Sequence, residues 1–333
     1  MMMRRVGSVM LVLAALVAVA APALAPHSVR EQFADYPNAP PMRIRIVDDA
    51  GRWHRPFVYP IELADRLERS YAEDRSRPMP VQWFREGALL RLGEGDGPLF
   101  LLGADSLGRD VLARLLYGAR ASLGVAVLGA FGALLLGALI GGIAGYAGGR
   151  ADEALMRLAD FVLVLPAVYV ILALRAVLPL VIEPLQVFVL VSSLLAAVGW
   201  PYAARGVRAI VAAEREREYA LAARSLGAGH VRLLFRHLLP ASRGFLAVQA
   251  TLLLPAFILA EATLSFVGFG FADPVPSWGT MLRDLTSGNI ADVTRFPWLL
   301  APVLAIILVV LAVHLVVGTR REATVLVALR QNR

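Results

Sequence analysis

The sequence contains no cysteine and no lysine, and each absence excludes a kind of chemistry. Without cysteine there is no disulfide and no thiolate metal site. A phosphate-binding ATPase loop needs a lysine beside its glycine-rich turn, and all 33 basic residues here are arginine. The sequence also lacks HExxH, GxSxG and paired-carboxylate patterns. We therefore expect a chain that is not an enzyme and holds no metal or cofactor of its own.

Charge of either sign is also scarce. Only 18% of the 333 residues are charged and 58% are hydrophobic, whereas soluble domains carry about 25% charged and about 45–50% apolar residues. A helix crosses a bilayer in about 17–25 residues, and four uncharged runs reach that length, with two more that contain polar interruptions. The six predicted spans are Val6–Ala25, Ala121–Gly149, Leu158–Leu178, Pro184–Ala204, Gly244–Phe269 and Phe296–Thr319.

The first run resembles a signal peptide, because Ala23 and Ala25 look like a cleavage site. Pro26 obstructs cleavage there, and the run is long for a signal core, so we expect a retained helix over residues 1–25. Arginine exceeds glutamate in the predicted loop 205–243 and in the tail 321–333. Because short cytoplasmic loops collect arginine, both termini are predicted to be cytoplasmic.

Residues 26–110 separate the first two predicted spans and are expected outside the cytoplasm. This segment is long enough for a small folded cap. Met42–Val47 alternates like a strand, Ile61–Glu73 has helical spacing, and Val81–Phe84 and Ala88–Leu92 are short strand candidates. The pattern predicts an α/β cap, with a structural role and a docking role both open.

Small residues recur every four positions in the second predicted span. Such a stripe predicts close helix packing, against a partner in this chain or in a sister subunit. Its members are Gly129, Ala133, Gly137, Gly141 and Gly145.

The loop after the fourth span carries the most informative pattern, EREREYALAARSLGAGHVRLLFRHLLP over residues 214–240. A helix is predicted over 214–227, with acidic residues in its first turns, where the helix dipole favours them, and with Gly227 as a left-handed cap. His230 and His237 are seven residues apart, too far for a metal pair, and are expected to be solvated or to contact a partner. One small apolar face, suited to close docking in another protein's groove, contains Tyr219, Ala222, Ala223 and Leu226.

The succession of Glu218, Ala222, Ala223, Gly227 and Pro240 resembles the coupling loop of permease subunits of ATP-binding-cassette importers. Three further stretches are similar to the dipeptide, oligopeptide and nickel branch of these permeases. They read GADSLGRDVLARLLYGARASL (103–123), GWPYAARGVR (199–208) and LAEATLSFVGFGFADPVPSWGTML (259–282). The resemblance covers about residues 101–318, and the segment before it matches nothing in the commonest members.

This resemblance implies an all-α type I importer permease domain over residues 111–320. The implied function is half of a pore that imports peptides by alternating access, with nickel complexes and sugars as open alternatives. The implied partners are a second permease, two ATPase subunits that use ATP and Mg²⁺, an extracytoplasmic binding protein and the lipid of a bacterial inner membrane. Nucleic acid is not expected, because the arginines lie where topology requires them. The implied contacts with the ATPase are Glu218, Tyr219, Ala222, Ala223, Leu226 and Gly227.

Glu261 is an ionisable residue inside a predicted span, and such residues are functional candidates. A structural hydrogen-bond hub and a group on the solute path are both open roles. A transporter driven by an ion gradient is the alternative function. That class usually carries several intramembrane carboxylates and broken helices, whereas Glu261 stands nearly alone in this sequence.

Overall fold

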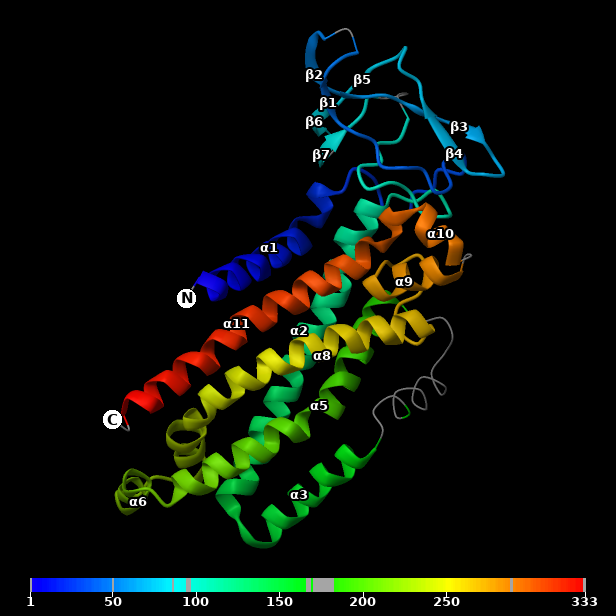
Figure 1. Cartoon of the computed structure of the whole chain (residues 1–333). Helices are drawn as coiled ribbons and strands as arrows, with labels where there is room; N and C mark the ends of the chain where they lie inside the picture. Colours follow the sequence, from blue (N-terminus) through cyan, green and yellow to red (C-terminus); the bar gives the residue numbers. More distant parts are fainter. Residues whose placement is uncertain are drawn as a thin grey trace. The chain divides into compact units, whose positions relative to one another are not determined.

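The computed structural model describes residues 2–49, 51–85, 87–93, 97–165, 169, 183–287 and 290–331. Figure 1 shows its helices and strands. The residues group into two compact units. Unit 1 contains Met1–Gly7, Gly124–Glu261 and Val313–Arg333, and unit 2 contains Ser8–Leu123 and Ala262–Ala312. Helices α1, α2, α8 and α11 contribute residues to both units.

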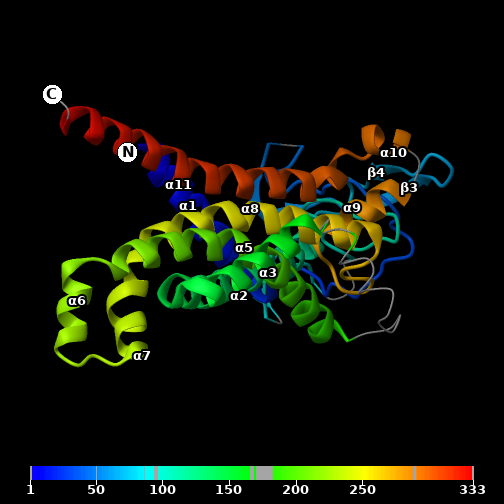
Figure 2. The ribbon, with the colours of Figure 1, turned by 90° about the horizontal axis from the view of Figure 1, so that it is seen from below.

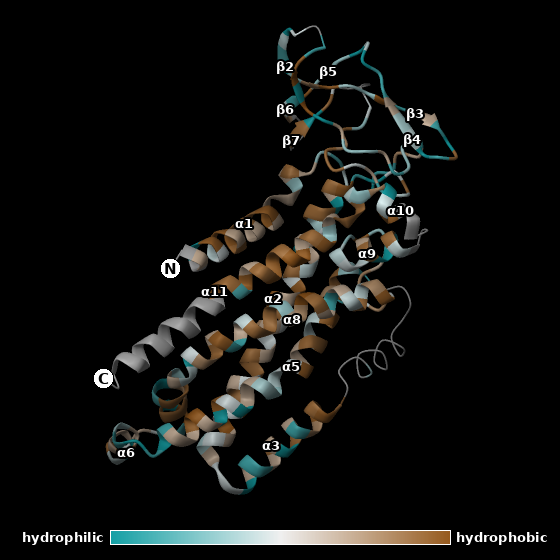
Figure 3. Ribbon diagram, in the orientation of Figure 1, coloured by the Kyte–Doolittle hydropathy of each residue, from teal (hydrophilic) through white to brown (hydrophobic). Residues whose placement is uncertain are grey.

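Among the described residues, five helices are long and apolar enough to cross a membrane. They are rich in hydrophobic residues, as the colouring of Figure 3 shows. The predicted span Leu158–Leu178 lies mostly outside the described residues, so five of the six predictions can be compared. The five helices are α1 (Met2–Leu24), α2 (Val111–Ala147), α5 (Pro184–Arg215), α8 (Arg243–Val267) and α11 (Ala301–Gln331).

Several of these helices extend beyond the uncharged runs that predicted them. Helix α2 begins at Val111 rather than Ala121, and α5 continues to Arg215 rather than ending at Ala204. Ion pairs accommodate the arginines of these added turns, since Arg114 of α2 binds Asp284 and Arg208 of α5 binds Asp152. Residues 321–331 of the predicted tail likewise continue α11, which is helical to Gln331.

The glycine stripe of α2 packs against α5 inside unit 1. A Cβ on Gly141 would lie 2.2 Å from the carbonyl oxygen of Ala204, and one on Gly145 would lie 2.5 Å from that of Arg208. The two backbones are therefore in contact at these positions, which only glycine permits. The predicted close packing is confirmed, with α5 of the same chain as the partner.

The rest of unit 1 consists of short helical elements. Figure 2 shows α6 and α7 as a hairpin-like pair beyond the carboxyl end of α5. The chain between α5 and α8 forms α6 (Glu218–Ser225), α7 (His230–Arg232), a π-helical turn η1 (Leu233–Leu238) and a 3₁₀ turn η2 (Leu239–Ser242), and α3 (Gly149–Val164) follows α2.

In unit 2, residues 26–110 form strands and turns. The three-stranded antiparallel sheet has the order β1–β2–β5, and two hairpins pair β3 with β4 and β6 with β7. Their shared core includes Val58, Met79, Leu99 and Phe100. The strands are β1 (Arg45–Val47), β2 (Trp53–Val58), β3 (Ile61–Asp65), β4 (Ser70–Glu73), β5 (Met79–Pro80), β6 (Gln82–Arg85) and β7 (Ala88–Arg91).

The α/β prediction for this segment was wrong in its helical part. Ile61–Glu73 forms the β3–β4 hairpin, in which Ile61 pairs with Glu73 and Leu63 with Tyr71. The carboxylate of Asp65 closes the turn by accepting the backbone N–H of Leu67 at 2.7 Å. Within the described part of residues 26–110 there is no helix, so we call this region the β-rich segment.

Unit 2 also contains the elements that precede α11. These are α9 (Trp278–Ser287), α10 (Ile290–Arg295) and the 3₁₀ turn η3 (Pro297–Leu300).

Candidate functional site

The predicted coupling helix is α6, and it is shorter than the 214–227 range expected from the sequence. Glu214 belongs to the last turn of α5, and Arg217 is extended, with φ −71° and ψ 148°. Helix α6 starts only at Glu218, so this residue alone of the three acidic ones lies in its first turn. The loop is thus a second short helix set off from α5 by a sharp break, not a single amphipathic helix.

Gly227 ends α6 as predicted. Its φ is +82°, in the left-handed region. Its N–H donates to the carbonyl of Arg224 at 2.9 Å, and the N–H of Ala228 donates to that of Ala223 at 3.0 Å, the two hydrogen bonds of a Schellman cap. No described atom lies within 4 Å of the position a Cβ would take. Glycine is therefore required here for its backbone conformation, not for space.

The faces of α6 differ from the prediction. Ala220 is only 1% exposed and packs in a cluster with Val207 and Val211 of α5 and Leu233, Leu234 and Leu238 of η1. Ala223 is half-buried beside that cluster. The outward face is apolar and contains Ala222, Tyr219 (42% exposed), Leu221 (47%) and Leu226 (89%). The sequence predicted a docking face alone and did not indicate that Ala220 packs against the chain's own core.

Tyr219 connects α6 back to α5. Its hydroxyl donates a hydrogen bond of 2.8 Å to Glu214. Partial burial, and then the Glu214 carboxylate, raise the pKa of Tyr219. This contact holds the outward face of α6 in a fixed orientation beside the end of α5.

Two arginines of α5 bind carboxylates of α3. The guanidinium of Arg208 donates to Asp152 at 2.9 Å, and Arg205 pairs with Asp160. The hydrogen bond from Arg208 lowers the pKa of Asp152. Part of the positive charge that predicted a cytoplasmic loop is therefore balanced within the chain.

A second cluster of charged side chains lies at the start of α2, in unit 2. Arg109 donates to Asp105 at 2.6 Å, and to Asp273 and Asp284 at 2.8 Å each. Arg114 donates to the same Asp284 at 2.8 Å. The two arginine side chains are only 4% and 1% exposed, and a buried charge requires such partners. Burial alone would lower the pKa of Arg109, but its carboxylate neighbours, led by Asp105, raise it.

The turn before α2 is held by the residues around this cluster. Asp110 caps α2 by accepting the N–H of Leu112 at 2.9 Å, and its other oxygen lies 3.1 Å from His27 Nδ1. Gly108 has φ +71°, and a Cβ there would lie 2.0 Å from the carbonyl oxygen of Phe33. These contacts explain Gly108 and Asp110, both in the 103–123 stretch, as structural requirements.

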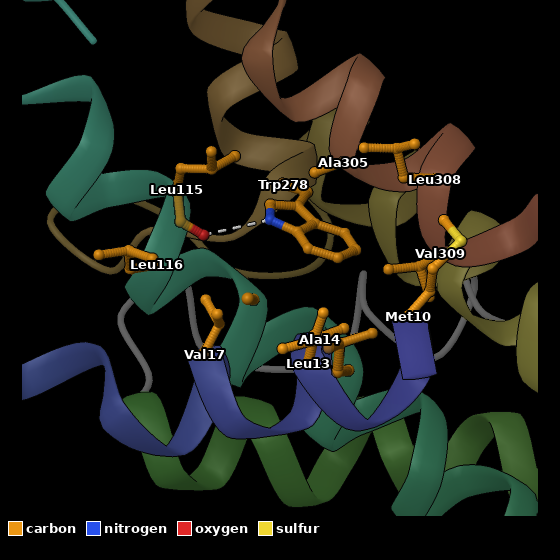
Figure 4. A pocket seen from close by; sticks show the side chains of 12 residues that line it. Met10, Leu13, Ala14, Val17, Leu115, Leu116, Trp278, Ala305, Leu308 and Val309 are labelled. Atoms are coloured by element: carbon orange, nitrogen blue, oxygen red, sulfur yellow. Dashed lines mark hydrogen bonds between the residues drawn. The ribbon is translucent and has the colours of Figure 1, made fainter. Parts of the chain in front are cut away.

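An apolar groove of about 290 Å³ lies in unit 2 (Figure 4). Its floor is Trp278, whose indole N–H donates to the carbonyl of Leu115 at 3.3 Å and whose backbone N–H donates to Ser122 at 3.1 Å. The walls come from α1, α2 and α11 and include Leu13, Val17, Leu116, Leu308 and Val309. Such a lining suits hydrocarbon and gives no polar group to orient a peptide.

Glu261 is completely buried in α8. A carboxyl group at such a position needs polar partners or access to water. Both roles expected from the sequence, a structural hub and a group on the solute path, fit this burial.

Residues 133–319 match the family described as the binding-protein-dependent transport system inner membrane component. The chain belongs to this family. It is therefore a multi-pass permease subunit of a membrane transport system and not an enzyme, as the resemblance implied. The matched range contains α6 and Glu261, whereas the β-rich segment, Arg109 and Arg114 precede it.

Curated relatives agree with this assignment. The chain is 38% identical over 196 residues to the oligopeptide transport system permease protein OppC of Bacillus subtilis, an alignment that covers 59% of this chain and 61% of that protein. It is 39% identical over 232 residues to the di/tripeptide transport system permease protein DppC of Pseudomonas aeruginosa, covering 69% and 73%. It is 41% identical over 229 residues to the dipeptide transport system permease protein DppC of Bacillus subtilis, covering 69% and 63%.

Proposed function

We propose that this permease forms half of the pore of an ATP-driven importer of peptides, and that α6 is the element through which ATPase subunits act on it. The observation that carries the proposal is the arrangement of α6. Its inner face is fixed by Ala220, its end by the Gly227 cap, and its outer face presents Tyr219, Ala222 and Leu226 to a partner. A short helix fixed at its base with an exposed apolar face is suited to seat in a groove of another protein.

In this proposal two ATPase subunits bind and hydrolyse ATP with Mg²⁺, one under this chain and one under a second, related permease. Their closure moves α6, and the permease pair opens outward; hydrolysis restores the inward-facing state. Glu218 contributes charge at the start of α6, and Ala222 and Ala223 permit close approach. Both termini then lie in the cytoplasm of a bacterium, and the β-rich segment lies outside, where a binding protein delivers the solute.

Peptides are the proposed substrate class because the relatives are named for oligopeptide, di/tripeptide and dipeptide transport. The apolar groove beside Trp278 is not proposed as the peptide site, since its lining offers a peptide backbone no hydrogen-bonding groups. Glu261 is the described residue that would favour ion-gradient coupling, because it is a fully buried carboxyl group in a spanning helix. Uptake that persists without ATP but stops when the gradient collapses would support that alternative.

The deciding experiment is a pull-down of the tagged chain from mild detergent with a Glu218→Arg, Ala222→Arg double variant. Both positions are exposed, so the arginines change the surface of α6 without disturbing a core. The matched control is Glu153→Arg, Ala154→Arg on α3, which alters the same two residue types at exposed positions.

We expect wild type and the α3 control to recover an ATPase subunit and a second permease, and the α6 variant to lose only the ATPase. Equal loss from both variants would show that added charge, not the α6 surface, disrupts the complex. Absence of an ATPase from the wild-type sample would refute the coupling proposal.

A further inference from the structure

Tyr146 lies in the last turn of α2, in the sequence GYAGGR (145–150). The last carbonyls of a helix lack partners within the helix. That of Tyr146 accepts a hydrogen bond of 2.9 Å from Arg215, at the end of α5. The backbone of Tyr146 thus connects the ends of the two helices that the glycine stripe packs together.

The side chain of Tyr146 reaches the coupling loop. Its hydroxyl and His230 Nδ1 share a hydrogen bond of 2.5 Å, in which the hydroxyl donates when Nδ1 carries no proton. The guanidinium of Arg224 lies 5.7 Å from the centre of the tyrosine ring, within the range of a cation–π contact. Arg224 belongs to α6, and His230 is the first residue of α7. One side chain of α2 therefore contacts both helices of the loop, and His230 is bound within the chain rather than solvated.

Helix α6 needs such contacts because its own packing is small. It has eight residues, and Ala220 is its one buried side chain among the residues described. Short isolated helices are marginal in water, and tertiary packing supplies most of a helix's stability. An alanine methyl provides little of it, so the orientation of α6 depends on polar and cation–π contacts. Tyr146 supplies one of these directly, with Arg224, and a second through the next helix, with His230 of α7.

We infer that Tyr146 is a positioning residue that makes α2 move together with the coupling loop. The inference rests on the proposed function, in which α6 is the element moved by the ATPases. By chain connection α6 leads only to α5 and, through η1 and η2, to α8. Leu234 of η1 and Leu239 of η2 already lie against α2 at Gly142. The Tyr146 contacts add a direct link from α2 to α6 and α7, so that a displacement of α6 is passed to α2 without η1 and η2 as intermediates.

The absence of cysteine in the chain allows a direct test by paired spin labels. One pair joins Ile143→Cys on α2 to Ser225→Cys on α6, and a reference pair joins Ile143→Cys to Tyr202→Cys on α5; all three side chains are exposed. Distances between the spin labels are measured by pulsed electron–electron double resonance in the purified complex. Each pair is measured in two states, one without nucleotide and one with ATP, Mg²⁺ and vanadate.

With Tyr146 present we expect a narrow 143–225 distance distribution that is the same in both nucleotide states. Tyr146→Leu removes the hydrogen bond and the ring, and should broaden this distribution and make it shift with nucleotide. Tyr146→Phe keeps the ring for Arg224 and should give an intermediate width. The 143–202 distance should not change in either variant, because the glycine stripe holds α2 to α5.

A 143–225 distribution as narrow in Tyr146→Leu as in wild type, in both nucleotide states, would overturn the inference. If Tyr146→Leu broadened the 143–202 distance distribution as much as the 143–225 distribution, the inference would also fail, since Tyr146 would then only stabilise the fold. The pull-down separates these outcomes from failure of the proposed function. If Tyr146→Leu still recovers the ATPase, the contact between α6 and the ATPase is intact, and the measured distances then test the role of Tyr146 alone.

Discussion

Valine at position 227 tests whether the end of α6 depends on a left-handed backbone. Gly227 has φ +82°, a conformation that costs an L-residue about 1–2 kcal/mol, and a β-branched side chain is a genuine outlier there. A cost of about 2 kcal/mol changes a population about 30-fold, because each 1.4 kcal/mol is a factor of ten. The variant should therefore populate an uncapped α6 whose outward face is no longer held in place.

Gly229→Val is the matched control. Gly229 has φ −65° and ψ 155°, an extended conformation that valine readily adopts. No described atom lies within 4 Å of a Cβ at either position, and both residues are exposed. The two variants add the same side chain two residues apart and differ in the backbone conformation they require. Gly227→Asn is a second control, because asparagine tolerates the left-handed region.

The assay is uptake of a radiolabelled alanine tripeptide, with the amount of permease in the membrane and the ATPase recovered by pull-down measured in parallel. We expect Gly227→Val to insert normally but to lose uptake and ATPase recovery. Gly229→Val should behave as wild type, and Gly227→Asn should retain most activity. Normal uptake by Gly227→Val, or equal loss in both valine variants, would refute the reasoning.

Three further predictions concern the spanning helices and the charge cluster. Gly141→Ala places a methyl against a carbonyl of α5 and should lower the free energy of unfolding by about 1–3 kcal/mol. The loss should appear as thermal unfolding at a lower temperature in detergent. Gly244→Ala is the control, with no described neighbour within 4 Å, and should unfold as wild type. Arg114→Met should destabilise by about 3 kcal/mol, because breaking a buried ion pair leaves charge uncompensated, whereas Arg157→Met at an exposed pair should cost less than about 1 kcal/mol. Glu261→Gln should keep tripeptide uptake if the residue is a structural hub, because an amide also forms hydrogen bonds; loss of uptake would favour a role on the path.

The end of α6 could be predicted because its signal is local. A glycine after a short periodic stretch is typical of a left-handed cap, and Gly227 has that conformation. The start of α6 was harder to predict. Glutamate and arginine are both good helix formers, so nothing in the EREREY sequence marks the break at Arg217. Tertiary packing sets that break, through Ala220 against η1 and α5.

The β3–β4 hairpin shows the limit of periodicity in short elements. Over five residues a strand and one helical turn place apolar side chains at similar positions, and length is then the main way to distinguish them. What decides the outcome is burial of Ile61 in a core built from residues as distant as Leu99 and Phe100. Contacts over such separations leave no periodic trace in the segment itself.

The charge cluster was outside the reach of sequence reasoning for a related reason, since Arg109 lies 164 and 175 residues from Asp273 and Asp284. The stretches 103–123 and 259–282 were each recognised by resemblance, as separate motifs. In the structure they bind each other, through the arginines and through the Trp278 backbone N–H on Ser122. Because Arg109, Arg114, Ser122 and Asp273 are used in this mutual contact, the resemblance at these positions reflects how the chain before α9 is fixed to the start of α2. It therefore carries information about the fold of the permease and little about the peptide that passes through it.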